Sequence, residues 1–323
     1  MSSNVLVITS KEDVTVDFVI TKLKERNIEY YRFNTEDIGS CIDVYFDGTD
    51  YSLRDKKKDK QIDLNLFTSI YFRRPKVPLP LAGLTLGEQR FYLTEITTYL
   101  EGLYRSLLGK YWLNSVFDIR MLENKPYQLS LANELELAVP NLSITNDYSD
   151  SLTFAHEHKN CIFKPLKSGL INEAIDKGKI LYTTKIDSHF LDNIESHGRM
   201  PLYLQKEIEK DSDIRVTVVG NKIFSAKISS QELEVSKVDW RKSESMLSHK
   251  RINLPKQIEE KCLLLCAKFN LDFAAIDFIL DKSGNFWFLE INPNGQWAWI
   301  ESLLNYPISD EIVNLLLSRG QEC

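Results

Sequence analysis

Residues 285–300 read NFWFLEINPNGQWAWI, and this stretch indicates more about the fold than any other part of the chain. It places Glu290 and Asn292 two residues apart in a run of aromatic and β-branched residues, which is typical of a strand. Successive side chains of a strand point to opposite faces, so these two oxygen-bearing side chains share one face. The stretch therefore predicts a strand that presents a carboxylate and an amide side by side.

A second predicted strand precedes it. Residues 273–280 (FAAIDFIL) are apolar and β-branched, and the segment 281–284 (DKSG) has the composition of a hairpin turn. Pairing of Leu280 with Asn285 would close this hairpin. The two strands would then be antiparallel neighbours in one sheet.

In that register Asp277 lies opposite Phe288 and diagonal to Glu290. Asp277, Glu290 and Asn292 would project from one face of the sheet. Three oxygen ligands without Cys or His suit Mg²⁺, which usually keeps waters and shares substrate phosphates. We expect a magnesium site here; the alternative is that each acid is an edge or cap residue of its strand.

The composition is that of a soluble globular enzyme, with 43% hydrophobic and 27% charged residues in 323. A formal charge of -6 argues against a nucleic-acid binder, because neutralising phosphates needs a basic face. No apolar run is long enough to span a membrane, and the N-terminus lacks a signal-peptide pattern, so we expect a cytoplasmic location. The cysteines fit neither a disulfide framework nor a zinc site, and Cys262 and Cys266 are expected to be buried.

The N-terminal part predicts a small α/β domain. Residues 4–10 and 29–33 are strand-like, and residues 13–26 between them have helical periodicity. This β-α-β order is typical of parallel strands. The loop after the first strand is not Gly-rich, so neither a Rossmann nor a P-loop fingerprint is present.

A strand over residues 68–75 (TSIYFRRP) ends with Arg73 and Arg74. These arginines could bind a carboxylate or phosphate, or could pair with surface acids; the residues alone favour neither. The remaining patterns predict helices over 86–109 with Gly109 as the C-cap, 116–125, 125–138 and 254–270, strands over 143–145, 160–165 and 201–209, and a hairpin of 214–219 with 222–228 around Gly220-Asn221.

Several residues suited to nucleotide chemistry follow one another along the chain. Lys125 starts a helix, and Lys164 ends a strand before the short loop 166–169. The segment Gln205–Ile208 lies at another strand end, where backbone groups could bind an adenine edge. The lysine ammonium groups could bind phosphates, and Arg215 could contact a transferring phosphoryl group. Each residue alone would more often be a surface charge, but their order favours a nucleotide site.

This order resembles the ATP-grasp superfamily over essentially the whole chain. It resembles most the ATP-grasp ligases that cyclise ribosomal peptides of the microviridin or graspetide type. The resemblance is carried by residues 71–75 (YFRRP), 213–228 (DIRVTVVGNKIFSAKI), 239–241 (DWR) and 288–301 (FLEINPNGQWAWIE). DIR and E-x-N occur in many ATP-grasp ligases, whereas RRP, DWR and NPNGQWAW look specific to the peptide-maturing branch.

The resemblance implies a mixed α/β and α+β fold in three parts. Residues 1–115 would be a pre-ATP-grasp domain, residues 116–200 the central lobe and residues 201–323 the catalytic lobe. It also implies ATP and Mg²⁺ as cofactors, a precursor peptide with a leader segment as partner, and a homodimer.

The resemblance assigns roles to individual residues. The nucleotide-binding residues would be Lys125, Lys164, Gln205, Lys206, Glu207 and Ile208; the catalytic residues Arg215 and Arg241; and the metal ligands Asp277, Glu290 and Asn292. Lys206 and Glu207 replace the Glu-aromatic pair common in the family, so only backbone contacts are expected there.

The implied reaction activates Glu or Asp side chains of a precursor peptide as acyl phosphates. Ser or Thr hydroxyls would then close ω-ester rings. The alternatives are ω-amide rings formed by Lys, a ligase that adds an amino acid to a peptide or protein, and a non-catalytic peptide-binding module. Asp213 and the oxygens of the acyl phosphate remain open as the base, and Trp297 and Trp299, facing one way in extended form, are expected to pack the core.

Overall fold

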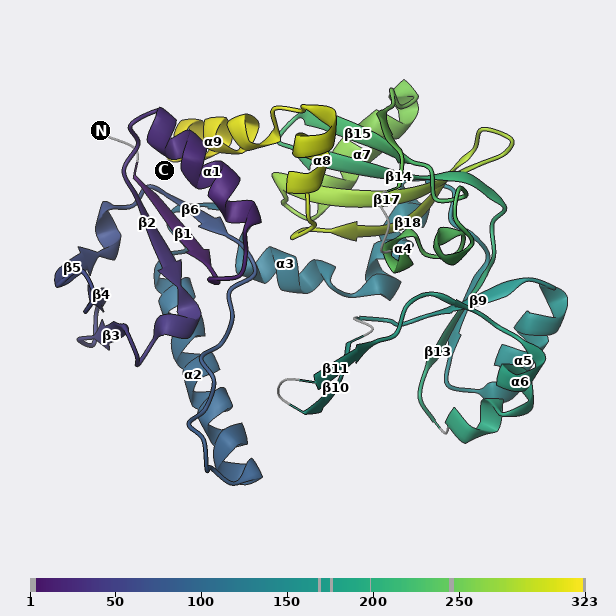
Figure 1. Cartoon of the computed structure of the whole chain (residues 1–323), viewed down its shortest axis with the longest axis horizontal. Coiled ribbons are helices and arrows are strands. Elements are labelled where there is room, and N and C mark those ends of the chain that lie inside the picture. Colours follow the sequence, from purple (N-terminus) through teal and green to yellow (C-terminus); the bar gives the residue numbers. More distant parts are fainter. Residues whose placement is uncertain (1–3, 168–169, 175–176, 198, 244–246, 322–323) are drawn as a thin grey trace. The chain divides into compact units, whose positions relative to one another are not determined.

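A computed structural model describes residues 4–167, 170–174, 177–197, 199–243 and 247–321 (Figure 1). The predicted loop residues Ser168 and Gly169 lie outside these ranges. The chain forms two compact units: the first comprises Met1–Ile119, Leu271–Phe273 and Pro293–Cys323, and the second Arg120–Asn270 and Ala274–Asn292. The three-part division expected from the resemblance stays a prediction.

A parallel sheet forms the centre of the first unit. Its strands are β1 (Val5–Thr9), β2 (Tyr30–Asn34), β6 (Ser69–Phe72) and β7 (Tyr111–Leu113), in the order β2-β1-β6-β7. Neighbouring strands all run parallel, and α1 (Thr15–Glu25) connects β1 to β2, which confirms the predicted β-α-β opening. β1 is buried along its whole length, as expected of a strand covered on both faces.

Three further helices and a small sheet complete the first unit. Their bounds are α2 (Leu86–Ser106), α8 (Ala298–Leu304), α9 (Ile308–Arg319), β3 (Ile42–Phe46), β4 (Tyr51–Asp55) and β5 (Lys60–Asp63). β3, β4 and β5 are antiparallel, and the charged residues 56–59 (KKKD) join β4 to β5. α9 packs against α1 and β6 through buried residues such as Ile312, Val313 and Leu316 (Figure 1).

The end of α2 differs from the prediction. The helix ends at Ser106 with Leu107 as its C-cap, so Gly109 is not the cap. The buried indole Nε1 of Trp112 donates a hydrogen bond of 2.9 Å to the Leu107 carbonyl oxygen. Because that terminal carbonyl is satisfied by a side chain, the helix end needs no left-handed glycine.

The second unit contains an antiparallel sheet in the order β12-β9-β13-β8. Its strands are β8 (Leu142–Thr145), β9 (Cys161–Lys164), β12 (Thr184–Lys185) and β13 (Leu202–Lys206). Between them in sequence lie the helices α5 (Tyr148–Glu157) and α6 (Ser188–Asp192) and the separate two-stranded hairpin of β10 (Leu170–Ala174) and β11 (Lys177–Ile180). Leu202, Leu204 and Ile194 form the buried cluster of the four-stranded sheet.

A larger sheet in the second unit has the order β16-β15-β14-β17-β18. Its strands are β14 (Lys210–Val219), β15 (Lys222–Ile228), β16 (His249–Arg251), β17 (Phe273–Asp281) and β18 (Phe286–Asn292). The predicted β14–β15 hairpin is confirmed: Val219 pairs with Lys222, and Gly220 has a φ of 58°. A positive φ there is easily reached by glycine, which has no Cβ.

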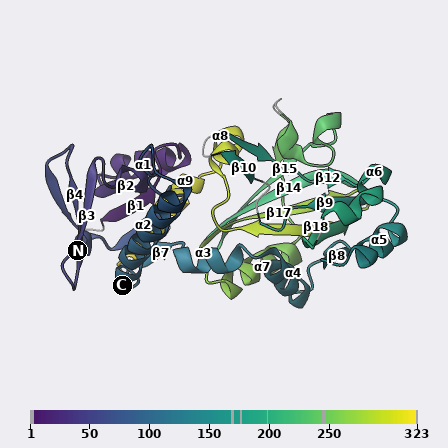
Figure 2. The same cartoon turned by 90° about the horizontal axis from the view of Figure 1, so that it is seen from below.

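Two helices, α4 (Lys125–Glu134) and α7 (Lys256–Lys268), lie side by side along this sheet (Figure 2). The Tyr127 ring meets the Phe269 ring edge-on, with 5.4 Å between centroids. The cysteines of α7, Cys262 and Cys266, are buried as predicted. α3 (Val116–Leu122) precedes α4.

α4 is shorter than predicted and ends at Glu134 rather than Ala138. Glu136 adopts a left-handed φ of 55°, and the Leu137 amide donates to the Ala132 carbonyl over 2.9 Å. This 6→1 hydrogen bond is typical of a Schellman end, which satisfies the last carbonyls and turns the chain away. Within the described residues no helix has both the length and the apolar character needed to cross a membrane.

Candidate active site

The β17–β18 hairpin has a register different from the one predicted. The Asp281 amide donates to the Asn285 carbonyl over 3.0 Å, and Leu280 pairs with Phe286 rather than with Asn285. The turn therefore holds three residues, with Gly284 at a φ of 89°. The Asp281 carboxylate fixes this turn, because it accepts from the Asn285 amide at 2.8 Å and from Trp287 Nε1 at 2.8 Å.

A second irregularity lies next to the predicted metal ligands. Asp277 pairs with Glu290 while Phe278 pairs with Phe288, so Leu289 is an extra, unpaired residue in β18. The prediction that Asp277 lies opposite Phe288 is wrong, because the three-residue turn shifts the register by one residue and this β-bulge shifts it by one more. As a result Asp277 lies directly opposite Glu290.

The three predicted metal ligands share one face of the sheet. Asn292 pairs with Ala275, two residues from the Asp277–Glu290 pair. Ile291 between the ligands is buried, whereas Glu290 and Asn292 are partly exposed. The face that these ligands share therefore opens away from the packed side of the sheet.

Arg215 on β14 lies against this face. Its Nε is 3.0 Å from Asp277 Oδ1, and its guanidinium is 5.9 Å from the centre of the Trp240 ring. The Arg215 side chain is only 9% exposed. Its buried Nη1 has no hydrogen-bond partner among the described residues. A buried cation with an unused donor fits an anionic ligand.

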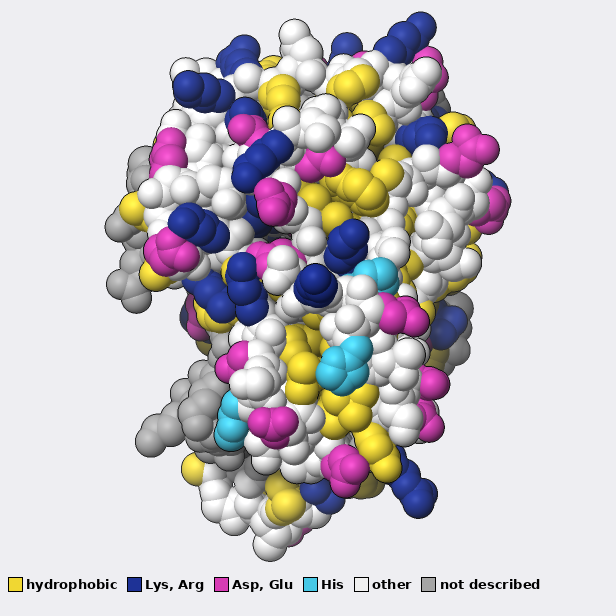
Figure 3. All heavy atoms as spheres, turned by 90° about the vertical axis from the view of Figure 1, so that its right-hand side faces the viewer, with side chains coloured by type: hydrophobic (Ala, Val, Ile, Leu, Met, Phe, Trp, Pro, Cys, Tyr) yellow, Lys and Arg dark blue, Asp and Glu magenta, His cyan; other side chains and the backbone are white. Residues whose placement is uncertain are grey.

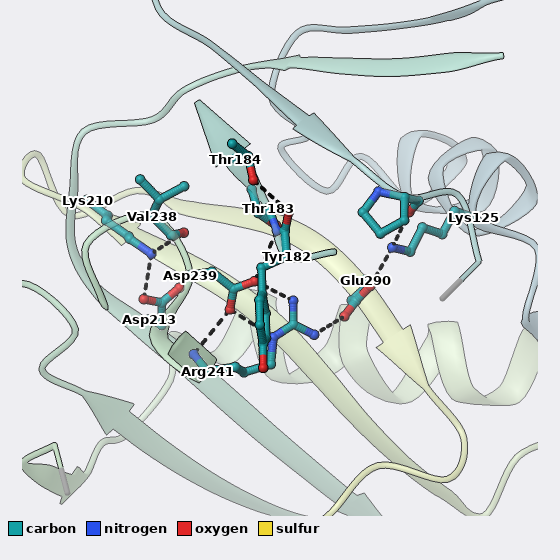
Figure 4. Close-up of polar contacts among 11 residues, drawn as sticks. Lys125, Tyr182, Thr183, Thr184, Lys210, Asp213, Val238, Asp239, Arg241 and Glu290 are labelled. Atoms are coloured by element: carbon teal, nitrogen blue, oxygen red, sulfur yellow. Dashed lines mark hydrogen bonds and ion pairs between the residues drawn. The ribbon is translucent and has the colours of Figure 1, made fainter. Parts of the chain in front are cut away.

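Lys125 approaches the same face from α4 (Figure 4). Asn124 caps the helix by accepting from the Tyr127 amide over 3.0 Å, which places Lys125 in the first turn. Lys125 Nζ is 3.2 Å from Glu290 Oε2 and donates to the Pro165 carbonyl over 2.9 Å. The ammonium thus connects the metal-ligand strand to the end of β9.

Lys164, the last residue of β9, is electrostatically part of this group. Burial, together with the charges of Lys125, Lys210 and Arg241, lowers the pKa of its ammonium to about 8 against the opposing charge of Glu290. Several cations therefore converge on one carboxylate. Such an excess of positive charge suits a polyphosphate.

Arg241 is held beside Glu290 by Asp239 (Figure 4). Its Nε and Nη2 each donate to the Asp239 carboxylate over 2.8 Å, and its Nη1 is 3.9 Å from Glu290 Oε1. The Asp239 pKa is below its usual value: burial opposes ionisation, but the hydrogen bonds and charge of Arg241 outweigh it. Hydrogen bonding to Asp239 likewise raises the pKa of Arg241. The bidentate pair fixes the guanidinium plane.

The pKa values of the two carboxylates of the face are shifted in opposite directions. Burial and the charge of Glu290 raise the pKa of Asp277 to about 6, against the opposing effect of Arg215. Burial also acts on Glu290, but Lys125, Arg241 and Lys164 hold its pKa below the usual value. A divalent cation between the two would favour the ionised form of both.

These residues fit Mg²⁺. The donor set is two carboxylates and one amide, all hard oxygens, and Asp277 and Glu290 are opposite each other in the sheet. No group of three or more His, Cys, Asp or Glu side chains that could hold a metal occurs in the part of the chain that the structure describes. Three protein ligands would leave positions for waters and substrate oxygens, as Mg²⁺ sites usually do.

The predicted adenine-binding segment lies at the end of β13. Gln205 is buried and donates to the Tyr203 hydroxyl over 3.3 Å. The Lys206 and Glu207 amides donate to the carbonyls of Asn141 and Asn160, each over 2.8 Å. The Glu207 carboxylate pairs with Lys185 at 2.8 Å, so this side chain is engaged outside the metal face.

Lys206, Glu207 and Ile208 also line a cavity of about 570 Å³ with residues of the α5–β9 connection and the β17–β18 turn. Basic and acidic side chains are interspersed on the molecular face where α5 and α6 lie (Figure 3). The part of Gln205–Ile208 in the site stays a prediction.

The two arginines of the RRP motif belong to the first unit. Arg73 is 1% exposed, pairs with buried Asp13 at 3.0 Å and donates to Gly295 O at 3.1 Å and Gln296 Oε1 at 2.7 Å. Arg74 donates to the Asn294 carbonyl over 3.1 Å. Both arginines thus bind the NPNGQ segment, and the acid that Arg73 pairs with is buried rather than on the surface.

The tryptophans after this segment are not extended. Trp297 is the N-cap of α8 and Trp299 lies within the helix, so the prediction that both face one way from an extended chain is wrong. Trp297 is fully buried and meets Phe18 edge-on, with ring centroids 5.9 Å apart. Its predicted role in the core is confirmed.

Sequence reasoning missed Gln128 and left Asp213 undecided. Asp213 is buried and accepts from Lys210 over 2.7 Å, so its carboxylate is already paired. Gln128 lies one helical turn after Lys125 and binds the backbone of Ile291, between the two ligands of β18. A glutamine three residues after the first lysine is the only trace of this contact in the sequence.

Comparison with known proteins gives a family match for the N-terminal part of the chain. Residues 4–120 match the family model described as "MvdD pre-ATP grasp domain". A search of the curated proteins finds no match.

Solved structures match nearly the whole chain. A ribosomal-peptide-associated ATP-grasp ligase of Chryseobacterium gregarium, in complex with ADP and a leader and core peptide, has 25% identity and a TM-score of 0.87 over 98% of this chain and 96% of its own. The macrocyclase MdnC of Microcystis aeruginosa MRC, bound with the precursor peptide MdnA, has 28% identity and a TM-score of 0.86 over 97% and 99%. The macrocyclase MdnB of the same organism has 26% and 0.80 over 98% and 99%. The chain therefore has the fold of the ATP-grasp ligases, its residues 4–120 match the MvdD pre-ATP-grasp domain, and it resembles the macrocyclases of ribosomal peptides over nearly its whole length.

Proposed function

We propose that this chain is an ATP- and Mg²⁺-dependent ligase that cyclises a ribosomal precursor peptide through ω-ester bonds. The observation that carries the proposal is one sheet face on which Asp277 and Glu290 lie opposite each other, with Arg215 3.0 Å from the first and Lys125 3.2 Å from the second. The relatives bound to ADP and to leader, core or precursor peptides support the choice of substrates.

The nucleotide would be held by cations on its phosphates and by backbone groups on its base. Lys125 and Lys164 supply the phosphate contacts, and the segment Gln205, Lys206, Glu207 and Ile208 the base contacts. Asp277, Glu290 and Asn292 would hold Mg²⁺, which when bound neutralises charge on the phosphate oxygens. Arg215 directs its unused Nη1 donor to the transferring phosphoryl group.

The reaction has two steps. A Glu or Asp carboxylate oxygen of the peptide attacks the γ-phosphorus, the bond to the bridging oxygen breaks, and ADP leaves. A Ser or Thr hydroxyl oxygen then attacks the acyl carbon, phosphate departs, and the hydroxyl proton is released. Each ring costs one ATP and removes the mass of one water from the peptide. Arg241, fixed by Asp239, binds the peptide carboxylate or its phosphate during these steps.

In this proposal residues 1–115, 116–200 and 201–323 act as the pre-ATP-grasp domain, central lobe and catalytic lobe. The partner is a precursor peptide with a leader segment, and the protein works in the cytoplasm as a homodimer. Light scattering of the purified chain tests the dimer.

Mass spectrometry tests the reaction. The purified chain is incubated with ATP, Mg²⁺ and the precursor peptide encoded beside its gene. Loss of one water mass per ring is expected, and mild alkali should reopen the rings, because esters hydrolyse and amides persist. Rings that survive alkali would show ω-amides, and a gain in mass by an amino acid would show the other kind of ligase. Absence of ADP release, with Glu290→Gln behaving like wild type, would show a binding module.

A further inference from the structure

Gln128 lies at the outer edge of β18, where its side chain binds the strand backbone. β18 is the last strand in its sheet order, so one edge of its backbone has no neighbouring strand among the described residues. Unpaired backbone groups at a buried edge are costly and need other partners. The partners here are the Ala138 carbonyl, which accepts from the Phe288 amide over 2.7 Å, and the side chain of Gln128.

Gln128 binds Ile291 as a neighbouring strand would. Its Oε1 accepts from the Ile291 amide at 3.1 Å, and its Nε2 donates to the Ile291 carbonyl at 3.0 Å. Nε2 also donates to the Leu122 carbonyl at 2.7 Å. The glutamine is buried, and both its Nε2 donors and its Oε1 acceptor take part in hydrogen bonds.

The bulge at Leu289 explains why the backbone of Ile291 faces the Gln128 side chain. Backbone groups of alternate residues point to the same edge of a regular strand, so Phe288 and Ile291, three residues apart, would point to opposite edges. The extra residue reverses the alternation and brings both to the outer edge. Gln128 therefore binds the strand at the residue between Glu290 and Asn292.

Lys125 and Gln128 act from one helix. Residues three apart lie on the same side of a helix. Lys125 Nζ is 3.2 Å from the Glu290 carboxylate, and Gln128 holds the next residue of β18 by its backbone. α4 therefore controls both the charge and the position of the ligand strand.

Resting on the proposed magnesium site, we infer that Gln128 is a positioning residue for the metal. By fixing the Ile291 backbone it sets the positions of the Glu290 and Asn292 side chains. Residues that orient metal ligands typically contribute a factor of about 10 to 100 to metal affinity.

The test uses Gln128→Met, which keeps the length and packing of the side chain but removes its donor and its acceptors. Mn²⁺ replaces Mg²⁺, and its affinity in the presence of ADP is measured from the electron paramagnetic resonance signal of free Mn²⁺. We expect the Kd for Mn²⁺ to rise about tenfold. The Kd for ADP in EDTA should stay within about twofold, because the hydrogen bonds of Gln128 do not reach the nucleotide.

Two further variants separate positioning from loss of structure. Gln128→Glu keeps the acceptor for the Ile291 amide but loses the donor to its carbonyl, so a smaller rise is expected; this variant also carries the test if Gln128→Met does not fold. Leu129→Ala removes a buried side chain from another face of α4 and should leave the Kd for Mn²⁺ unchanged.

The inference is overturned if the Kd for Mn²⁺ of the Gln128 variants stays within twofold of wild type. It is also overturned if ADP affinity in EDTA falls as much as metal affinity, or if Leu129→Ala matches the Gln128 variants. A wild-type chain without metal-dependent ADP binding would instead refute the proposed function, which is a different result.

Discussion

Replacing Arg73 by Met should destabilise the first unit strongly. Arg73 and Asp13 are 1% and 6% exposed, and their side chains pair at 3.0 Å. The change would leave the Asp13 carboxylate buried without its cation, which typically costs about 3 to 5 kcal/mol. It would also remove the donors to Gly295 O and Gln296 Oε1, so we expect a free energy of unfolding lower by at least about 3 kcal/mol.

Urea denaturation followed by tryptophan fluorescence measures this loss, since Trp112 and Trp297 are buried in the same unit. Arg74→Met is the matched control. Arg74 is exposed and donates to the Asn294 carbonyl, so its loss should cost less than about 1 kcal/mol.

A double-mutant cycle tests the cause. Arg73→Met combined with Asp13→Asn removes both charges, and the pair should recover about 2 kcal/mol or more of the summed single losses. A loss below about 1 kcal/mol in Arg73→Met, or strict additivity in the cycle, would refute the account of a buried, mutually dependent pair.

Three further predictions concern the second unit. Glu290→Gln should reduce peptide-dependent ADP release by at least about tenfold and raise the Mg²⁺ concentration needed for half-maximal rate, as a coupled assay over a Mg²⁺ titration measures; an unchanged titration would contradict the ligand role. Asp239→Asn should leave the Arg241 guanidinium unfixed and lower kcat about tenfold or more while ADP affinity in a calorimeter stays constant; loss of ADP affinity instead would mean that the pair serves nucleotide binding. Hydrogen bonds from Trp287 and Asn285 lower the pKa of Asp281 to about 2 in the folded chain. The contribution of the Asp281 carboxylate to the free energy of unfolding is therefore full above the unfolded pKa of about 4 and is lost as the pH falls towards 2. The stability difference between wild type and Asp281→Ala in urea should accordingly shrink between pH 5 and pH 3, and a difference independent of pH would exclude the charged turn as its source.

The sequence was sufficient for the parts of the fold governed by local periodicity. The β1-α1-β2 opening, the Gly220-Asn221 hairpin and helix α7 follow from apolar spacing and turn chemistry, which act within a few residues. The shared face of Glu290 and Asn292 follows from the two-residue period of a strand for the same reason.

What could not be predicted depends on contacts between distant residues. The bulge at Leu289 leaves no mark in the alternation of NFWFLEIN, yet it decides which residue faces Asp277. The prediction that Gly109 caps α2 is wrong because the Trp112 indole donates to the carbonyl oxygen of the actual C-cap, Leu107. The partner of Arg73 is the buried Asp13, which lies sixty residues away in sequence, and local sequence patterns do not predict contacts over such a separation.

The first compact unit contains residues from both ends of the chain. The matched pre-ATP-grasp segment ends at residue 120, whereas the compact unit to which it belongs also takes in Pro293–Cys323. α9 covers α1 and β6, and Arg26 binds Asp310 at 2.8 Å. A fragment ending at residue 120 would expose those apolar surfaces, so it should aggregate rather than fold. The segment that the family model matches is thus smaller than the compact unit, and chimeras between relatives should exchange the C-terminal helices together with the N-terminal domain.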